Sequence, residues 1–198
     1  MSDQKQPAKT PINAKRKRGS MNPDPPAGVK RDKLSAATQK DHSRRLVIET
    51  LGSLRELVDR EFVAVDWVPV EQERIQAFAE LTDDLQWIHV DVERARRESP
   101  YRSTVAHGFL TLALLSHFMD DAIEIKPKEH FAVNYGLNRV RFPAPVRAGD
   151  LIRARFQLRS LEEKPGGYRA IYAATVDLKG FSKPCCVADW IVDYSPLR

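Results

Sequence analysis

The spacing of apolar positions predicts three long helices in the first two thirds of the chain. From His42 to Arg60, the larger apolar residues recur at helical spacing, which indicates an amphipathic helix packed against the domain. A second helix is expected from Val70 to Leu81, where the apolar residues share one face. From Gly108 to Ile123, apolar residues cover nearly every side, so this helix should be buried nearly all round.

Alternation with a period of two predicts that the last third of the chain forms strands. Between Asp150 and Leu161, polar and apolar residues alternate, as in a strand with one buried face. A hairpin loop is expected at Pro165-Gly166-Gly167. The strands expected there are Phe131–Phe142, Asp150–Leu161, Tyr168–Leu178 and Lys183–Tyr194, and an earlier strand is expected at Phe62–Val68. Runs of strands after one core helix indicate an α+β protein, in which a sheet wrapped around Gly108–Ile123 would bury that helix.

The candidate chemistry lies just before this central helix. The chain reads Thr82-Asp83-Asp84-Leu85-Gln86-Trp87-Ile88-His89-Val90-Asp91, then a short helix expected at Asp91–Glu98, a loop, and Ala106-His107-Gly108. On a regular helix Asp84 and His89 would be about 140° apart. The backbone between them must therefore bend if they act together. A carboxylate and an imidazole that meet at one water could divide general acid and general base catalysis near neutral pH.

Each of these residues also has a purely structural interpretation. Asp84 stands in a Thr-Asp-Asp cluster of the kind found at helix ends. His89 could be a hydrogen-bonded, partly buried histidine, and His107-Gly108 could be a tight turn into the next helix. The residues by themselves leave both interpretations open.

Taken together, the segments resemble the signature of MaoC-like dehydratases, the (R)-specific enoyl-CoA hydratases of hotdog fold. The resemblance rests on Thr82-x-Asp84-x-Gln86-x-Ile88-His89-x-Asp91 followed by Ala106-His107-Gly108, and it covers roughly residues 51–194. The run from Asn134 to Val146 resembles the subgroup related to nodulation protein N. Asp83 stands where the family usually has glycine, which adds a carboxylate beside Asp84 and removes a residue that tolerates positive φ. Gln86 and Trp87 replace the usual Asn-Pro.

The resemblance implies an enzyme that reversibly hydrates a trans-2-enoyl-CoA to an (R)-3-hydroxyacyl-CoA. Asp84 and His89 would activate the water, and the backbone amide of Gly108 at the helix N-terminus would bind the developing oxyanion. The family places acyl-thioester sites at a subunit interface, so a homodimer is expected, without metal or redox cofactor. Related hotdog enzymes that act on acyl-carrier-protein thioesters, or that hydrolyse thioesters, are the alternatives.

Four further residues are candidates for substrate binding: Gln86, His107, Asn138 and Arg139. Arg139 or Arg141 would suit a coenzyme A phosphate, because arginine makes bidentate phosphate contacts. The other interpretation is that these charges simply face solvent from an edge strand.

Charge separates a basic tail from the rest of the chain. Residues 1–45 carry twelve Lys or Arg and four Asp, a net charge of +8, whereas the whole chain carries +5, which leaves −3 for the remainder. Residues 1–41 are rich in proline and poor in large apolar residues, so we expect a disordered tail followed by a single domain over residues 42–198. The run Lys15-Arg16-Lys17-Arg18 has no aromatic residue beside it for base stacking, so nucleic-acid binding is not expected. A binding or regulatory protein that acts through this tail is the non-enzyme alternative.

Cysteine content and hydropathy predict a cytoplasmic protein. The two cysteines, Cys185 and Cys186, are adjacent and provide no disulfide framework. Residues 1–19 lack the apolar stretch of a signal peptide, and the most apolar segment, Phe109–Met119, is too short to span a bilayer. We therefore expect no membrane partner.

Overall fold

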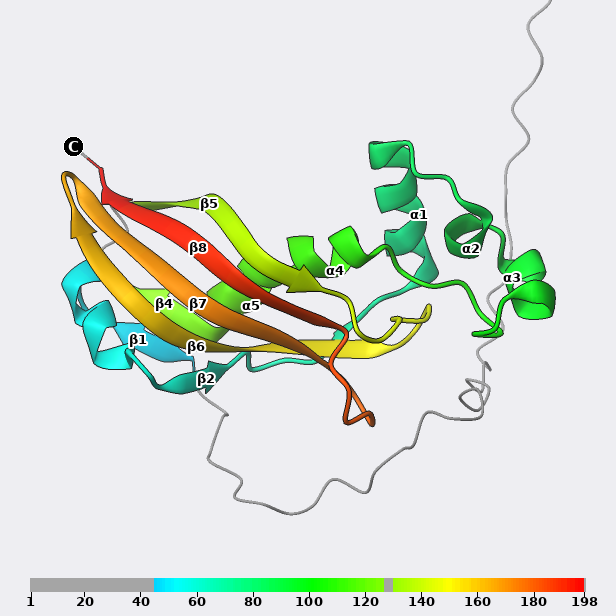
Figure 1. Ribbon diagram of the computed structural model, residues 1–198, viewed down its shortest axis with the longest axis horizontal. Helices are drawn as coiled ribbons and strands as arrows, with labels where there is room; N and C mark the ends of the chain where they lie inside the picture. The colour runs from blue at the N-terminus through cyan, green and yellow to red at the C-terminus, as the bar shows by residue number, and fades with distance from the viewer. Residues whose placement is uncertain (1–44, 127–129, 198) are drawn as a thin grey trace, which may run out of the picture.

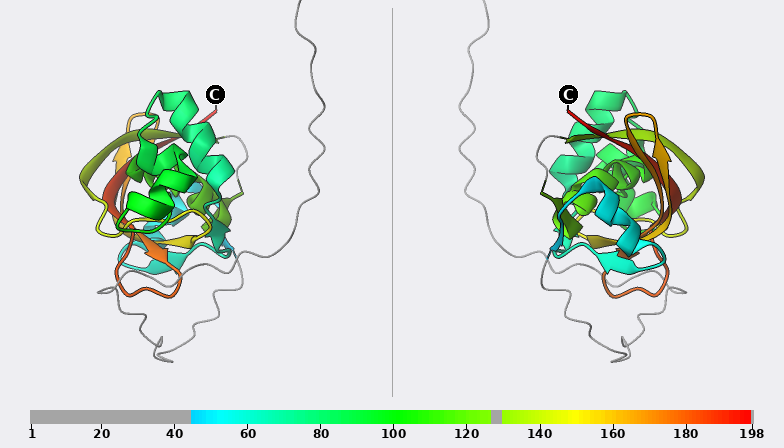
Figure 2. Two further views of the ribbon diagram at one scale, coloured as in Figure 1. Left: turned by 90° about the vertical axis from the view of Figure 1, so that its right-hand side faces the viewer. Right: turned by 90° about the vertical axis from the view of Figure 1, so that its left-hand side faces the viewer.

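The central feature of the protein is a curved antiparallel sheet. The computed structural model describes residues 45–126 and 130–197, so the predicted tail over residues 1–41 lies outside the described residues. The strand order is β2 (Glu61–Val63), β6 (Leu151–Lys164), β7 (Gly167–Leu178), β8 (Cys186–Pro196) and β5 (His130–Arg141), and β3 (Val68–Pro69) also pairs with β6. The sheet curls around the helices that follow residue 107 (Figures 1 and 2).

The long strands β6, β7 and β8 alternate between buried and less buried residues over most of their length, whereas β5 is exposed along most of its length. On β6, Ile152, Ala154, Phe156 and Leu158 are buried against the helices, and the polar residues between them face outward. The predicted hairpin joins β6 to β7, with Lys164 opposite Gly167. Gly166 has a φ of 85°, a conformation that residues with a side chain rarely adopt, so the turn depends on glycine. Strand prediction succeeded here because the turn and the alternation are both local.

The central helix lies on the concave face of the sheet as two consecutive segments, α4 (Gly108–Ala113) and α5 (Leu115–Ala122). Leu114 between them keeps helical backbone angles, so the predicted helix is confirmed in outline. The expectation of burial on nearly every side is wrong, since Phe109 is 68% exposed and Ala113, Ser116 and His117 further along are exposed as well. The sheet covers one side of the helix pair, whereas Phe109 lies toward the end of β5, where its ring meets Phe142.

The predicted amphipathic helix from His42 to Arg60 is wrong. Among its described residues, Leu46–Ile48 form strand β1, which pairs in parallel with β4 (Ile123–Ile125), and Leu51–Leu57 form a 3₁₀ helix, η1. Leu51, Leu54 and Leu57 are its buried residues. Their spacing of three matches the three residues per turn of a 3₁₀ helix, and over so short a segment it is hard to distinguish from α-helical spacing. The predicted strand Phe62–Val68 is likewise split into β2 and β3.

Three helices lie beyond one end of the sheet (Figure 1). They are α1 (Gln72–Thr82), α2 (Trp87–Val90) and α3 (Val92–Glu98). The predictions for α1 and α3 are confirmed, and the Asp91 side chain caps α3 by accepting a hydrogen bond from the Arg94 amide at 2.9 Å.

Cys185 and Cys186 are buried and free, at the start of β8. No helix within the described ranges combines the length and the apolar character needed to cross a membrane.

Candidate active site

A sharp turn after α1 brings Asp84 and His89 into one cluster. Helix α1 ends at Thr82, and the next residue, Asp83, has a left-handed φ of 57°. Asp84 and the following residues then leave the helix axis, and α2 begins only at Trp87. The two side chains therefore do not lie on one continuous helix. The backbone between them bends, as joint action of the two residues requires.

The position of Asp83 explains how the chain does without the expected glycine. A left-handed residue after a helix is usually glycine, but aspartate and asparagine tolerate the conformation better than other residues with a side chain. Asp83 is exposed, so its carboxylate remains in contact with solvent. The departure from the family pattern therefore preserves the turn.

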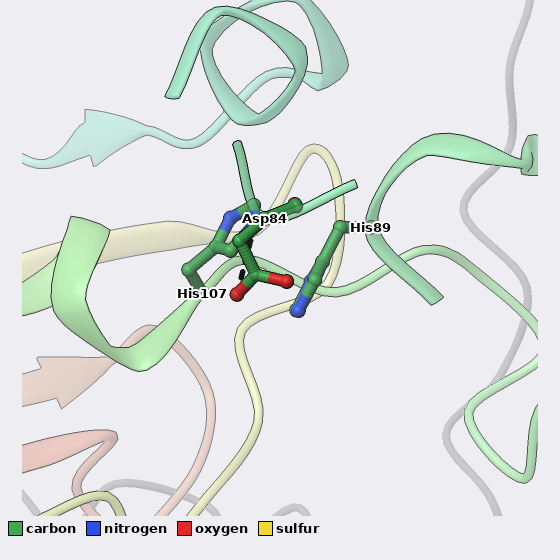
Figure 3. Close-up of side chains that lie close together, drawn as sticks. All are labelled: Asp84, His89 and His107. Atoms are coloured by element: carbon green, nitrogen blue, oxygen red, sulfur yellow. Dashed lines mark hydrogen bonds and ion pairs between the residues drawn. The ribbon is translucent and has the colours of Figure 1, made fainter. Parts of the chain in front are cut away.

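Asp84, His89 and His107 form the site. Their potential ligand atoms lie within 4.8 Å of one another, and Figure 3 shows the carboxylate and the two imidazole rings turned toward each other. The His89 and His107 rings stack, with centroids 3.7 Å apart and planes at 24°. Both histidines are buried, whereas the Asp84 side chain is 56% exposed. Solvent thus reaches the cluster from the Asp84 side.

A backbone contact fixes the orientation and tautomer of His89. Its Nδ1 lies 2.6 Å from the carbonyl oxygen of Val105. A carbonyl oxygen can only accept, so Nδ1 carries the hydrogen and, in the neutral ring, Nε2 carries a free lone pair. Burial lowers the pKa of His89 below its ordinary value of 6.5, and the nearby His107 also lowers it, against the opposing effects of the Val105 hydrogen bond and the Asp84 charge. His89 is therefore a neutral base at pH 7.

His107 contacts both Asp84 and His89. Its Nε2 lies 3.0 Å from the backbone carbonyl oxygen of Asp84 and 3.8 Å from the carboxylate. The ring lies between His89 and Phe78, and its buried Nδ1 has no hydrogen-bond partner among the described residues. These contacts hold the Asp84 backbone next to His89. The predicted role of His107 in substrate binding remains a prediction.

Gly108 stands at the point where α4 begins against the end of the sheet. A Cβ at this position would lie 2.7 Å from Cδ2 of Phe142, closer than side chains tolerate. Glycine thus allows the segment after β5 to pack against the helix. The Gly108 amide belongs to the first turn of α4, where backbone N–H groups have no acceptor within the helix.

The remaining predicted substrate-binding residues are not part of this cluster. Gln86 is exposed at the start of α2. Asn138 is exposed near the end of β5, and Arg139 is 88% exposed and forms an ion pair with Asp189 at 3.4 Å. Within the described residues, no hydrogen bond or ion pair connects Asn138 or Arg139 to Asp84, His89 or His107. Their roles stay predictions.

The cluster contains the kinds of atoms that bind a metal ion, since two imidazoles and a carboxylate are common zinc ligands. In a zinc site, however, each ligand atom lies about 2 Å from the ion, so ligand atoms up to 4.8 Å apart would need to move closer. That the site works without a metal stays a prediction.

Sequence reasoning missed the groups that hold these residues in place. The carbonyl of Val105 orients His89, and Phe142 packs where the Gly108 side chain would be. A backbone carbonyl has no signature in a sequence, and Phe142 appeared only as the end of a strand. Residue spacing carries no signal for either contact.

Comparisons with known proteins indicate the family of the chain. The family model for the MaoC like domain matches residues 53–175. The chain is 43% identical over 147 residues to 3-hydroxyacyl-thioester dehydratase Z of Mycobacterium tuberculosis, covering 74% of this chain and 96% of that protein. It is 38% identical over 143 residues to nodulation protein N of Rhizobium meliloti, covering 72% of this chain and 89% of that protein.

The chain is also similar in fold to a solved structure. The R-hydratase from Pseudomonas aeruginosa superposes with a TM-score of 0.56 over 71% of this chain and 83% of that one, at 21% identity. The α+β class and the sheet wrapped around a central helix, both expected from the sequence, are confirmed. The chain belongs to the MaoC-like family, has the hotdog fold and is an enzyme of the dehydratase and hydratase class.

Proposed function

We propose that the enzyme catalyses reversible hydration of a trans-2-enoyl-CoA to an (R)-3-hydroxyacyl-CoA at Asp84 and His89. The observation that carries the proposal is the meeting of an exposed carboxylate with an imidazole whose Nε2 is free to accept a proton. In hydration the water oxygen bonds to C3, one proton adds to C2, and the second water hydrogen stays on the new hydroxyl. The carboxylate and Nε2 are both proton acceptors, so together they can bind the water and transfer its proton.

The amide of Gly108 is the proposed oxyanion site. When hydroxide character adds to C3, negative charge moves to the thioester carbonyl oxygen, which needs a hydrogen-bond donor. The Gly108 amide lies directly after His107 in the chain and at the start of α4, where the helix dipole favours negative charge. These features support the role.

A cavity next to Gly108 supports an acyl substrate. About 260 Å³ of space lies between α4, α5, β5 and β8. Its apolar lining includes Phe109, Leu112, Leu137 and Trp190. Because Phe109 directly follows Gly108, an acyl chain could extend into this space from a carbonyl held at the Gly108 amide. This arrangement suits an apolar chain better than a free polar acid.

Turnover assays distinguish the proposal from its alternatives. We would incubate the purified full chain with crotonyl-CoA, longer enoyl-CoAs and the same acyl groups on an acyl carrier protein, and follow loss of the enoyl absorbance and release of free thiol. Hydration of the CoA esters without thiol release is expected. Thiol release would indicate a thioesterase. Hydration of the carrier-protein thioesters alone would indicate that the substrate is an acyl-carrier-protein thioester. Absence of any turnover, with salt-sensitive nucleic-acid binding that deletion of residues 1–40 removes, would favour the tail-mediated alternative.

We also propose that the enzyme is a homodimer joined at β5. This strand lies at the edge of the sheet and has exposed apolar side chains, including Phe131, Val133 and Tyr135. A long apolar edge strand favours pairing with another chain. We expect Val133→Lys to lower the mass in solution from that of a dimer to that of a monomer, measured by sedimentation. Val47→Lys is the matched control, since Val47 is exposed to a similar degree, 47% against 49%. A monomeric parent protein would contradict the proposal.

The pH dependence of hydration follows from the lowered pKa of His89. Because the neutral ring is the proposed base, kcat/KM should decline with a midpoint below pH 6.5, as His89 becomes protonated. NMR titration of the His89 ring should give a pKa below 6.5. The unfolded chain binds this proton more readily, so the free energy of unfolding should also decrease as pH falls below 6.5. A His89 pKa above 7 would contradict both expectations.

A further inference from the structure

The side-chain amide of Gln72 connects two segments of the site that are distant in the sequence. Gln72 is the first residue of α1, and its Nε2 donates to the carbonyl oxygen of His89 at 2.8 Å. Its Oε1 accepts a hydrogen bond from the hydroxyl of Thr104. Thr104 is 1% exposed, so its hydroxyl has no access to solvent as a replacement partner. One amide group thus joins α2 to the segment before His107.

These contacts complete a closed network of hydrogen bonds through His89. The His89 imidazole donates through Nδ1 to the carbonyl of Val105, which directly follows Thr104. The His89 backbone carbonyl is bound through Gln72 to the side chain of that same Thr104. The backbone and the ring of His89 are therefore both attached to one two-residue segment. With both ends held, rotation about the His89 side-chain bonds would have to break a hydrogen bond.

The segment that carries Thr104 and Val105 is itself anchored. The Ala148 amide donates to the Thr104 carbonyl at 3.0 Å, and the Ala106 amide donates to the Val146 carbonyl at 2.7 Å. Helix α2, by contrast, has only four residues, and so short a helix has little stability of its own. The position of His89 must therefore be determined by what α2 is attached to.

We propose that Gln72 and Thr104 are positioning residues that hold the His89 ring with Nδ1 on Val105 and Nε2 toward Asp84. Neither side chain needs to contact the substrate. This inference rests on the proposed function for its effect on rate, but the effect on the His89 ring can be measured without any substrate.

Substitutions at Thr104 separate hydrogen bonding from packing. Thr104→Val keeps the shape of the side chain but removes the hydroxyl, whereas Thr104→Ser keeps the hydroxyl but loses a buried methyl group. If hydrogen bonding positions His89, the serine variant will be more active than the valine variant. If Thr104 only fills space, the order will be reversed. Gln72→Leu tests the hydrogen bonds made by the Gln72 amide. Gln76→Leu is its control on the same helix, because the Gln76 side chain donates to the Glu80 carboxylate at 2.8 Å.

The expected result is a loss of kcat of roughly tenfold to a hundredfold in Gln72→Leu and Thr104→Val, as is usual when a catalytic group shifts by about 1 Å. KM should change little, because no contact with the substrate is removed. Thr104→Ser and Gln76→Leu should stay near the parent enzyme. In ¹⁵N spectra of the His89 ring, the parent and these two controls should show a protonated Nδ1, whereas the two affected variants should show a mixture of tautomers.

Three outcomes would overturn the proposal: a valine variant more active than the serine variant, a Gln72→Leu enzyme with unchanged kcat, or an unchanged His89 spectrum in both affected variants. If the parent enzyme hydrates no thioester, the proposed function fails, and the ring spectra alone then decide whether Gln72 and Thr104 position His89.

Discussion

Replacement of Asp84 by asparagine should lower the rate of enoyl-thioester hydration by roughly 10²- to 10⁴-fold, the usual contribution of general acid–base catalysis. Asparagine has nearly the same shape, so the turn after α1 and the contact with His107 through the Asp84 backbone are preserved. The variant loses the negative charge of the carboxylate and its capacity to bind and exchange a proton. Initial rates with a short enoyl-CoA at saturating concentration measure the effect.

His89→Ala should produce a loss of similar size, and the double variant should lose little more than the worse single variant, since groups that act as a unit have non-additive effects. Multiplicative losses would mean that the two side chains act independently. Because His89 is buried and stacked on His107, its removal also leaves a void, so unfolding by denaturant must show that the variant is folded at the assay temperature.

Asp83→Asn is the matched control for Asp84→Asn. It makes the same chemical change at the adjacent residue, and asparagine tolerates the left-handed φ of 57° at this position. We expect activity close to that of the parent enzyme. Equal losses in the Asp83 and Asp84 variants would show that general charge, rather than the Asp84 carboxylate, matters for hydration.

Gly108→Ala should reduce both stability and activity. The added Cβ would lie 2.7–2.9 Å from three ring atoms of Phe142, so either the ring or the start of α4 must move. Overpacking of this kind typically costs about 1–3 kcal/mol of folding free energy. If the Gly108 amide moves away from the oxyanion, the further loss of transition-state stabilisation is about 2.7–4 kcal/mol, which corresponds to a rate loss of roughly 10²- to 10³-fold. Denaturant unfolding and kcat measure the two effects separately.

A second substitution tests whether Phe142 is the cause. Alanine retains the backbone amide, so Gly108→Ala combined with Phe142→Ala should recover stability and much of the activity relative to Gly108→Ala. Phe142→Ala alone supplies the reference for the lost ring, which is 40% exposed. If Gly108→Ala is as stable as the parent protein, the contact with Phe142 is not restrictive and the steric argument fails.

Local signals were sufficient for much of the fold. The β6–β7 hairpin, helix α1 and the Asp91 cap of α3 all follow from patterns within about ten residues, where turn chemistry, periodicity and capping operate. The prediction for the segment before β2 was wrong because leucines spaced three residues apart fit both a 3₁₀ helix and an α-helix. The parallel pairing of β1 with β4 joins Leu46 to Ile123, and no local pattern encodes so distant a contact.

The candidate site was predicted in part. The family resemblance placed Asp84 and His89 together, and the turn at Asp83 supplies the required bend. The stacking of His107 on His89, and the Gln72 amide between His89 and Thr104, could not be predicted, because Gln72 and Thr104 are 32 residues apart in the chain. In the sequence, Gln72 looks like an ordinary polar residue in the first turn of a helix. Its role depends on the residues that the tertiary fold places beside it, His89 and Thr104.

The two buried cysteines have a practical consequence. Burial raises the pKa of Cys186 to about 11 and that of Cys185 further still, so neither thiol has appreciable thiolate at neutral pH. They are the only cysteines in the sequence. A cysteine introduced at exposed Arg55, on η1 at the end of the molecule opposite α1–α3, should therefore react selectively with a maleimide. A fluorophore attached there would report on subunit assembly while leaving the chemistry undisturbed.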